Sequence, residues 1–297
     1  MRETLLLLVA GALVMAVDAR ADADLVTRSI AVSDSVLAAM DPFASFWDAA
    51  APAEVVAIGQ AVTTPSLLDA PPVALEVRGV HNGRWIALRI AWPDSTRDAS
   101  VEVSRFSDQV AVQWPVSLDP GVSPFMGTPH DPRGRVHIVH WKAIWQDDID
   151  HGYQDVQTLH PHFWSDLYYM AAQDLYPFPV ARSFNSPEAR VALMGVYAGN
   201  PVSQPQRSTP VEDLMAEGFG TLTTQPRQNC FGRGVWKNGH WNVVITRPLT
   251  TDDPLDAPLS LGQEIPIAFA VWDGAGRHVG ARKRFVPWIT MILEPPK

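Results

Sequence analysis

The stretch Trp85-Ile86-Ala87-Leu88-Arg89-Ile90-Ala91-Trp92 decides the fold class of this chain. Large apolar side chains occupy its even-numbered positions, whereas small, polar or aromatic residues occupy the odd-numbered ones. Successive side chains of a β-strand point to opposite faces, so this alternation is typical of a strand with one face buried. We therefore expect the even-numbered residues to lie in a core between two sheets.

Similar runs recur along the chain and are separated by turn residues such as His81-Asn82-Gly83 and Lys237-Asn238-Gly239. Strands of this length and spacing predict an all-β fold, an antiparallel β-sandwich. The expected strands are Val73–Val80, Trp85–Trp92, Val101–Phe106, Gln109–Val116, Arg135–Trp145, Gly239–Arg247, Ile265–Trp272 and Lys283–Leu293.

The pattern weakens between residues 146 and 230, where Asp, Gly, Pro, Ser and aromatic residues prevail. Short helices are possible only near Trp164–Asp174 and Val211–Gly218. Since so long a structureless connection is unusual inside a compact domain, we interpret 146–230 as a loop-rich insertion packed on the sandwich or on a partner. Residues 22–297 are then predicted to form a single domain.

The N-terminus combines Arg2 with an apolar run from Leu5 to Val17 and a small-x-small sequence, Ala19-Arg20-Ala21. This predicts a cleaved signal peptide over residues 1–21 and a periplasmic location, with an uncleaved anchor as the alternative. The apolar run is short for a membrane span, and no later run is longer, so we expect no stable membrane insertion. The formal net charge of -9 argues against nucleic acid as a partner.

Cys230 is the only cysteine, so the chain has no internal disulfide. A Cys-x-x-Cys-His motif is also missing, which excludes covalent c-type haem attachment. Met126 lies between Pro124 and Pro129 in a Pro/Gly loop before a strongly β-patterned run. Such a loop could offer a thioether inward as an axial haem ligand, although core packing is the commoner role of methionine.

Several sequence blocks, taken in order, resemble the haem b-binding gamma subunits of periplasmic molybdenum enzymes of the ethylbenzene dehydrogenase and dimethylsulfide dehydrogenase type. They span nearly the whole chain after residue 21. The blocks are Asn82-Gly83-Arg84-Trp85, Ala91-Trp92-Pro93-Asp94, Phe106-Ser107-Asp108-Gln109-Val110-Ala111-Val112-Gln113, Pro124-Phe125-Met126-Gly127, Trp141-Lys142-Ala143, Gly218-Phe219-Gly220-Thr221-Leu222-Thr223, Gly234-Val235-Trp236, Gly239-His240-Trp241, Arg247-Pro248-Leu249, Ala270-Val271-Trp272-Asp273-Gly274 and Arg282-Lys283.

The resemblance implies one noncovalent haem b held between a methionine, at Met126, and a lysine. Lys283 is the first choice for the lysine, because the family's Arg-Lys pair follows its Trp-Asp-Gly turn; Lys237 and Lys142 are the alternatives. The implied role is electron transfer between the iron-sulfur subunit of a complex with a molybdenum-containing catalytic subunit and a soluble periplasmic carrier. The chain alone would not be an enzyme.

A ligating lysine must lose its proton, which burial favours, and Arg282 and Arg284 would favour it too from the opposite face of the strand. The alternative is that these three basic residues form a solvated tail. Haem propionates need cationic or amide partners. Three arginines are general candidates, each more commonly a surface residue: Arg84, Arg135 and Arg247.

Other site hypotheses are weaker. His137 and His140 are three apart in a strand and should face opposite sides, so they do not readily share a metal; His160 and His162 lack a third ligand. The acidic run Asp147, Asp148 and Asp150 lacks EF-hand spacing and predicts a solvated turn. The rival function is a secreted carbohydrate-binding sandwich that uses exposed tryptophans, with Trp236 and Trp241 beside Gly-rich turns.

Overall fold

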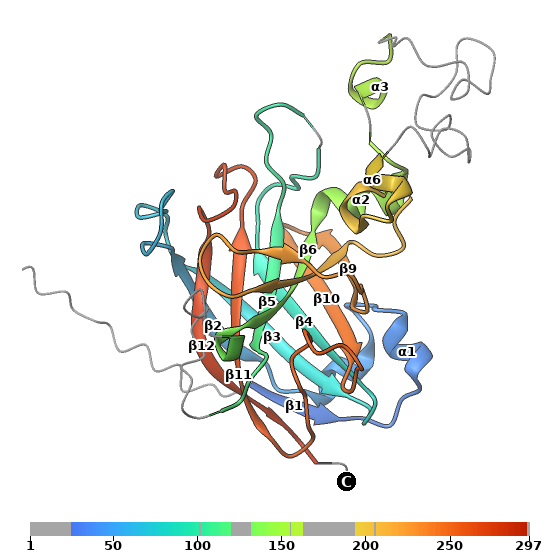
Figure 1. Ribbon diagram of the computed structural model, residues 1–297, viewed down its shortest axis with the longest axis vertical. Coiled ribbons are helices and arrows are strands. Elements are labelled where there is room, and N and C mark those ends of the chain that lie inside the picture. Colours follow the sequence, from blue (N-terminus) through green and yellow to red (C-terminus); the bar gives the residue numbers. More distant parts are fainter. Residues whose placement is uncertain are drawn as a thin grey trace, which may run out of the picture.

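The computed structural model describes residues 25–100, 102–119, 132–154, 156–162, 194–204 and 206–295. Its strands form two packed layers, with the helices at the periphery (Figure 1). The strands are β1 Leu25–Ser29, β2 Ala53–Gly59, β3 Val73–His81, β4 Trp85–Pro93, β5 Gln109–Pro115, β6 Val136–Lys142, β7 Val211–Ala216, β8 Thr223–Thr224, β9 Phe231–Lys237, β10 His240–Pro248, β11 Glu264–Trp272 and β12 Arg284–Leu293. The helical elements are α1 Asp34–Ala38, η1 Ser45–Ala49, η2 Pro132–Gly134, α2 Ala143–His151, α3 Val156–Leu159, α6 Met194–Tyr197 and η3 Pro201–Ser203.

The strands are hydrogen-bonded in the order β8-β7-β6-β5-β11-β12-β1-β3-β4-β10-β9, and β2 pairs with β12 and β3. The strand β1 runs parallel to both β12 and β3 and so joins the two layers. The other strand pairs among the described residues are antiparallel, as in the register that runs from Trp85 opposite Pro248 to Pro93 opposite His240. The predicted antiparallel β-sandwich is therefore confirmed.

The main core lies between the layers, and the alternation in β4 is confirmed. Ile86, Leu88, Ile90 and Trp92 are each 2% exposed or less and belong to the main apolar cluster. Burying such side chains stabilises the fold by about 1.5–3 kcal/mol each. The strand pattern of β4 thus fixes which face of its layer turns inward.

Three sequence predictions are wrong in detail. Residues 102–106 form a turn in which Ser104 has a φ of 65°, so no strand covers the described part of Val101–Phe106. The strand expected to continue to Trp145 ends at Lys142, because the amide of Ala143 donates to the Asp108 carbonyl and α2 begins there.

The third wrong prediction is the helix at Val211–Gly218, where β7 instead pairs with β6. Cross-strand pairing outweighs the weak local preference of this segment. The other possible helix, Trp164–Asp174, lies outside the described residues. So does the predicted signal peptide, residues 1–21, while in the described ranges no helix is both long and apolar enough to cross a bilayer.

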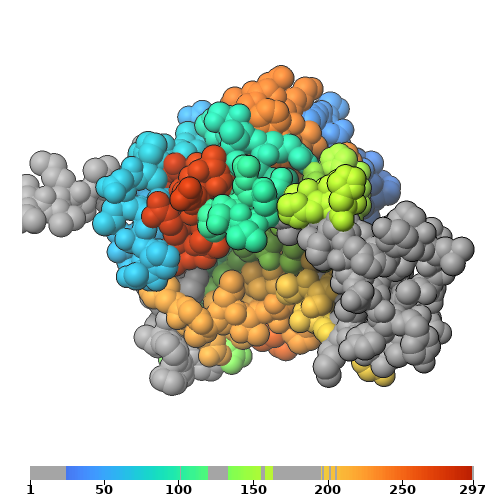
Figure 2. Space-filling model, turned by 90° about the horizontal axis from the view of Figure 1, so that it is seen from above, coloured from blue at the N-terminus to red at the C-terminus, as the bar shows by residue number. Residues whose placement is uncertain are grey.

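One end of the sandwich gathers three segments that are distant in sequence. The backbone amide of Gln60, just after β2, donates to the carbonyl of Lys283, just before β12, at 3.0 Å. The backbone amide of Gly274, just after β11, donates at 2.8 Å to the carboxylate of Asp108, which lies just before β5. Figure 2 looks onto this end, where the segments after β2, before β12 and before β5 lie side by side.

Candidate functional site

The layer formed by β7, β6, β5, β11 and β12 is apolar on both faces. Its inward residues join the main core, whereas the residues that alternate with them form a second apolar cluster on the outer face. A sandwich sheet ordinarily has a polar outer face. The members of this outer cluster are Ala111, Val136, Ile138, Leu214, Ala216, Ala270 and Trp272, with Phe285 and Trp288 packed against them.

The centre of the outer cluster is floored by small residues. Ala111 on β5 lies opposite Ala270 on β11, and both are less than 9% exposed. The register continues this row to Phe285 on β12 and to His140 on β6. The middle of this face therefore consists of small apolar side chains.

Lys283 lies at one end of this outer face. Its Nζ is 4.9 Å from the centroid of the Trp272 ring. Within the described residues the amine has neither a carboxylate partner nor a hydrogen bond, and burial lowers its pKa. An unpaired amine that loses its proton readily can act as a nitrogen ligand.

The two neighbouring arginines turn away from this face, as predicted. Arg282 donates to the Ser66 carbonyl at 3.4 Å, and Arg284 donates to the Pro71 carbonyl at 2.9 Å. The prediction that they help to deprotonate Lys283 is wrong, since burial alone lowers its pKa. Their positions instead anchor the segment after β2. Lys283 is part of a packed surface and not of a solvated tail.

The alternative lysines occupy different surroundings. Lys142 forms an ion pair with Glu212, and its Nζ lies 3.9 Å from the Trp145 ring centroid. Burial lowers the pKa of Lys142, and the Glu212 carboxylate opposes this change. Lys237 is exposed on the other layer, with its Nζ 5.0 Å from the ring centroid of Phe43. Neither is an unpaired buried amine.

Met126 lies outside the described residues, but the roots of its loop are described. The amide of Val116, after β5, donates to the carbonyl of Arg135, before β6, at 2.9 Å. These roots are at the end of β5 opposite Lys283, because Pro115 pairs with Val136 whereas Gln109 pairs with Trp272.

His140 faces the same outer surface and is 9% exposed. Its ring stacks on Trp272, with centroids 4.8 Å apart and an interplanar angle of 27°. Its Nε2 atom is buried without a hydrogen-bond partner. Burial, together with Lys142 and Lys283, holds the pKa of His140 well below its usual value. The ring is therefore neutral, with one polar atom unsatisfied.

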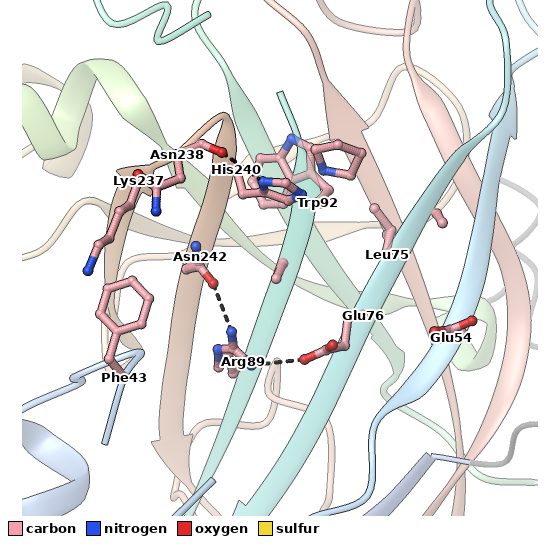
Figure 3. A pocket seen from close by; sticks show the side chains of 13 residues that line it. Phe43, Glu54, Leu75, Glu76, Arg89, Trp92, Lys237, Asn238, His240 and Asn242 are labelled. Carbon is pink, nitrogen blue, oxygen red and sulfur yellow. Dashed lines mark hydrogen bonds and ion pairs between the residues drawn. The ribbon is translucent and has the colours of Figure 1, made fainter. Parts of the chain in front are cut away.

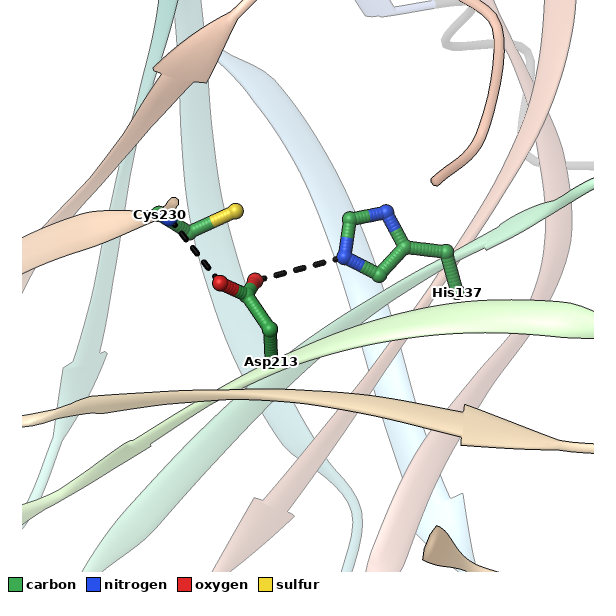
Figure 4. A group of neighbouring side chains, drawn as sticks. All are labelled: His137, Asp213 and Cys230. Atoms are coloured by element: carbon green, nitrogen blue, oxygen red, sulfur yellow. Dashed lines mark hydrogen bonds and ion pairs between the residues drawn. The ribbon is translucent and has the colours of Figure 1, made fainter. Parts of the chain in front are cut away.

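His137 points into the main core, so the prediction that His137 and His140 face opposite sides is confirmed. His137 Nε2 donates to Asp213 at 3.3 Å, and its Nδ1 accepts from Arg247 at 3.0 Å. The Asp213 carboxylate also accepts from the amide of Cys230 at 2.9 Å (Figure 4). The candidate ligand atoms of these three residues lie within 4.8 Å of one another, yet the nitrogens and oxygens already have partners. This cluster is a polar link between strands.

The arginines considered for propionates are engaged elsewhere. Arg84 pairs with Asp34 at 2.9 Å, and Arg135 pairs with Glu217 at 2.6 Å. Arg247 is 1% exposed and bonded to His137, so the expectation of a surface arginine is wrong there.

The acidic run near residue 147 is not a solvated turn, because it lies in α2. Asp147 accepts from Arg97 and pairs with His151, and Asp148 pairs with Arg207 at 3.4 Å. These ion pairs anchor the helix to its surroundings and leave no open carboxylate cluster at these two residues.

A separate cleft of about 540 Å³ lies on the other layer. Figure 3 shows Arg89 at its floor, bonded to Glu76 at 2.9 Å and to Asn242 at 2.8 Å. The tryptophan that lines it, Trp92, is 2% exposed. Among the tryptophans of the described ranges none is exposed, and Trp241 is 1% exposed, so an exposed tryptophan platform for sugars is not found there.

Comparisons with known proteins found matches among solved structures and among curated sequences. Two solved structures of a carbohydrate binding module family 9 from Caldicellulosiruptor kristjanssonii, one with glucose and one with cellotriose, match with TM-scores of 0.38 and 0.41 and identities of 7% and 6%. The alignments cover 91% and 93% of this chain and 85% and 95% of theirs.

Two curated relatives are more similar in sequence. The chlorate reductase subunit gamma of Ideonella dechloratans is 25% identical over 78% of this chain and 74% of its own length. The dimethylsulfide dehydrogenase subunit gamma of Rhodovulum sulfidophilum is 26% identical over 76% of this chain and 62% of its own. The ethylbenzene dehydrogenase family model matches residues 44–284. This range contains the whole outer-face site except Phe285 and Trp288. Because the match covers most of the sequence, the chain belongs to the ethylbenzene dehydrogenase family.

Proposed function

We propose that this chain is the electron-transfer subunit of a periplasmic molybdenum oxidoreductase and binds one noncovalent haem b. The observation that carries the proposal is the half-buried amine of Lys283, without a described carboxylate partner, beside an apolar outer face in a chain of the ethylbenzene dehydrogenase family. A further curated relative, from Haloferax mediterranei, is named "Putative respiratory nitrate reductase heme subunit ORF7" and is 21% identical over 88% of this chain and 72% of its own length.

The residues of the outer face fit the proposed group. A porphyrin is flat and apolar over most of its area, and the row through Ala111 and Ala270 consists of small apolar side chains. Nε2 of His140 is a buried polar atom without a partner at this face. Such an atom is costly to bury unless something binds it.

In this proposal Lys283 would hold the haem iron through its amine, and Met126 would hold it through its thioether. A haem iron held by two protein ligands would supply reversible one-electron transfer between its ferrous and ferric states. The apolar side chains exclude water from the site, and burial lowers the pKa of Lys283 and so favours the loss of its proton. The chain is then a relay without catalytic activity of its own.

The proposed partners are a molybdenum-containing catalytic subunit, an iron-sulfur subunit and a soluble periplasmic carrier. The names of two curated relatives describe them as gamma subunits, which supports a role inside a complex. The proposal includes export after cleavage of residues 1–21. Affinity purification from the native periplasm, followed by metal analysis for molybdenum and iron, tests the assembly.

The haem proposal is tested by titrating the purified protein with haemin. We expect a low-spin b-type spectrum with a Soret band that shifts on dithionite reduction. Lys283→Met should lose the nitrogen ligand and change the spectrum, whereas the matched variant Lys237→Met, at an exposed lysine on the other layer, should leave it unchanged. A spectrum that changes in Lys237→Met or Lys142→Met but not in Lys283→Met refutes the assignment of Lys283, and a wild type that takes up no haem refutes the function.

A further inference from the structure

His140 is the strongest feature of the outer face that the axial ligands do not explain. The imidazole is 9% exposed, and its Nε2 is a buried polar atom without a partner. Buried polar side-chain atoms in folded proteins nearly always have one. The orphan atom therefore points to a group that the polypeptide itself does not provide.

The neighbours of His140 cannot satisfy it. Glu212 lies opposite His140 in the register between β6 and β7, but its carboxylate is paired with Lys142 and accepts from Thr224 at 2.6 Å. On the other side the register brings Ala111, which has no polar side chain. The stacked Trp272 directs its own Nε1 to the Gly280 carbonyl at 2.9 Å. No described side chain thus competes for Nε2.

The chemistry of the missing acceptor is restricted. The pyrrole nitrogens of a haem are bound to iron, so its only free hydrogen-bond acceptors are the two carboxylates. An imidazole N–H is a good donor to a carboxylate, and such charge-assisted hydrogen bonds are stronger than neutral ones.

We propose that His140 Nε2 donates a hydrogen bond to a carboxylate of the bound haem and so fixes the haem's orientation on the outer face. This inference rests on the proposed function. His140 acts as a positioning residue and is distinct from the axial ligands. Its ring is held for this task by stacking on Trp272 and by its place in β6.

The test compares haemin with its iron dimethyl ester, in which esterification removes the charge of both carboxylates, on wild type and His140→Phe. Phenylalanine keeps the ring that packs on Trp272 but has no donor. Wild type should bind haemin more tightly than the ester. His140→Phe should bind haemin about tenfold more weakly than wild type does. The factor by which esterification weakens binding should be about tenfold smaller in His140→Phe than in wild type. His240→Phe, at an exposed histidine of β10, is the matched control and should behave as wild type.

Other outcomes overturn the inference. If esterification weakens binding by the same factor in wild type and in His140→Phe, His140 does not bind a carboxylate. Loss of the low-spin bands in His140→Phe would assign His140 to the iron instead. If the His140→Phe variant does not fold, His140→Leu provides the same test without a donor. His140→Asn retains an N–H and should recover part of the preference for haemin over its ester. Absence of haemin binding in wild type would instead refute the proposed function.

Discussion

Replacing Lys283 by methionine should make the protein without haem more stable, although it abolishes the proposed nitrogen ligation. The folded protein half-buries Lys283 without a described carboxylate partner, and this burial lowers its pKa. Each unit of lowering corresponds to about 1.4 kcal/mol of folding free energy lost in the protonated state. Methionine has a similar length and no charge, so Lys283→Met removes that cost. Each 1 kcal/mol gained would raise Tm by roughly 2–4 °C.

The pH dependence of this gain has a defined sign. Below the folded-state pKa of Lys283 the amine is protonated in both the folded and the unfolded state, and the full cost of burying it is present. As pH rises from that value towards the unfolded pKa of about 10.4 the cost is lost. The advantage of Lys283→Met should therefore be largest at neutral pH and vanish above about pH 10.4.

Lys142→Met is the control, and it should act in the opposite direction. Lys142 is paired with Glu212, which is 4% exposed. Removing one partner of a buried pair leaves an uncompensated charge and costs about 3 kcal/mol. Urea unfolding of haem-free wild type and both variants at pH 7 and pH 10 measures these differences. A haem-free Lys283→Met that is less stable than wild type at pH 7, or a gain that is the same at both pH values, refutes the reasoning.

Three further predictions follow from other parts of the molecule. Met126→Ala should lower the reduction potential of the bound haem, because a thioether favours ferrous iron; a spectroelectrochemical potential equal to that of wild type contradicts the assignment. Gly234→Val should cost about 1–3 kcal/mol in urea unfolding, since a Cβ at Gly234 would lie 2.1 Å from Trp141, and an unchanged midpoint would show that the two are not packed as described. Burial raises the pKa of Asp108 to about 7, so the folded protein holds this proton more tightly than the unfolded chain does. Wild-type stability should therefore fall as pH rises from about 4 to about 7. Asp108→Asn should lack this pH-dependent loss, and identical stability-against-pH profiles of the two proteins would contradict the prediction.

The sequence predicted those elements whose burial follows a local period. The strand β4 was predictable because its even-numbered residues all face one core. Val211–Ala216 was not, since it becomes a strand by pairing with β6, more than 60 residues earlier in the chain. The buried link between His137 and Asp213 was missed for the same reason, because the two residues are 76 positions apart and share no local pattern.

The site was only partly predictable, and the reason lies in β5. Its sequence Val110-Ala111-Val112 shows no alternation, because the strand is apolar on both faces. From sequence alone such a run indicates a fully buried strand and does not say what covers each side. Only the pairing of β5 with β11, which sets Ala111 against Ala270, shows that small apolar side chains meet on the outer face.

The placement of small residues on this face argues for a function beyond packing. Positions 111 and 270 hold alanines, and beside them lie Lys283, without a described carboxylate partner, and His140, whose Nε2 is a buried polar atom without a partner. All of these features reduce stability when nothing is bound. Sites that bind a partner or cofactor are where proteins give up stability in this way, and a flat apolar group with acidic substituents accounts for the alanines, the orphan imidazole and the unpaired amine together.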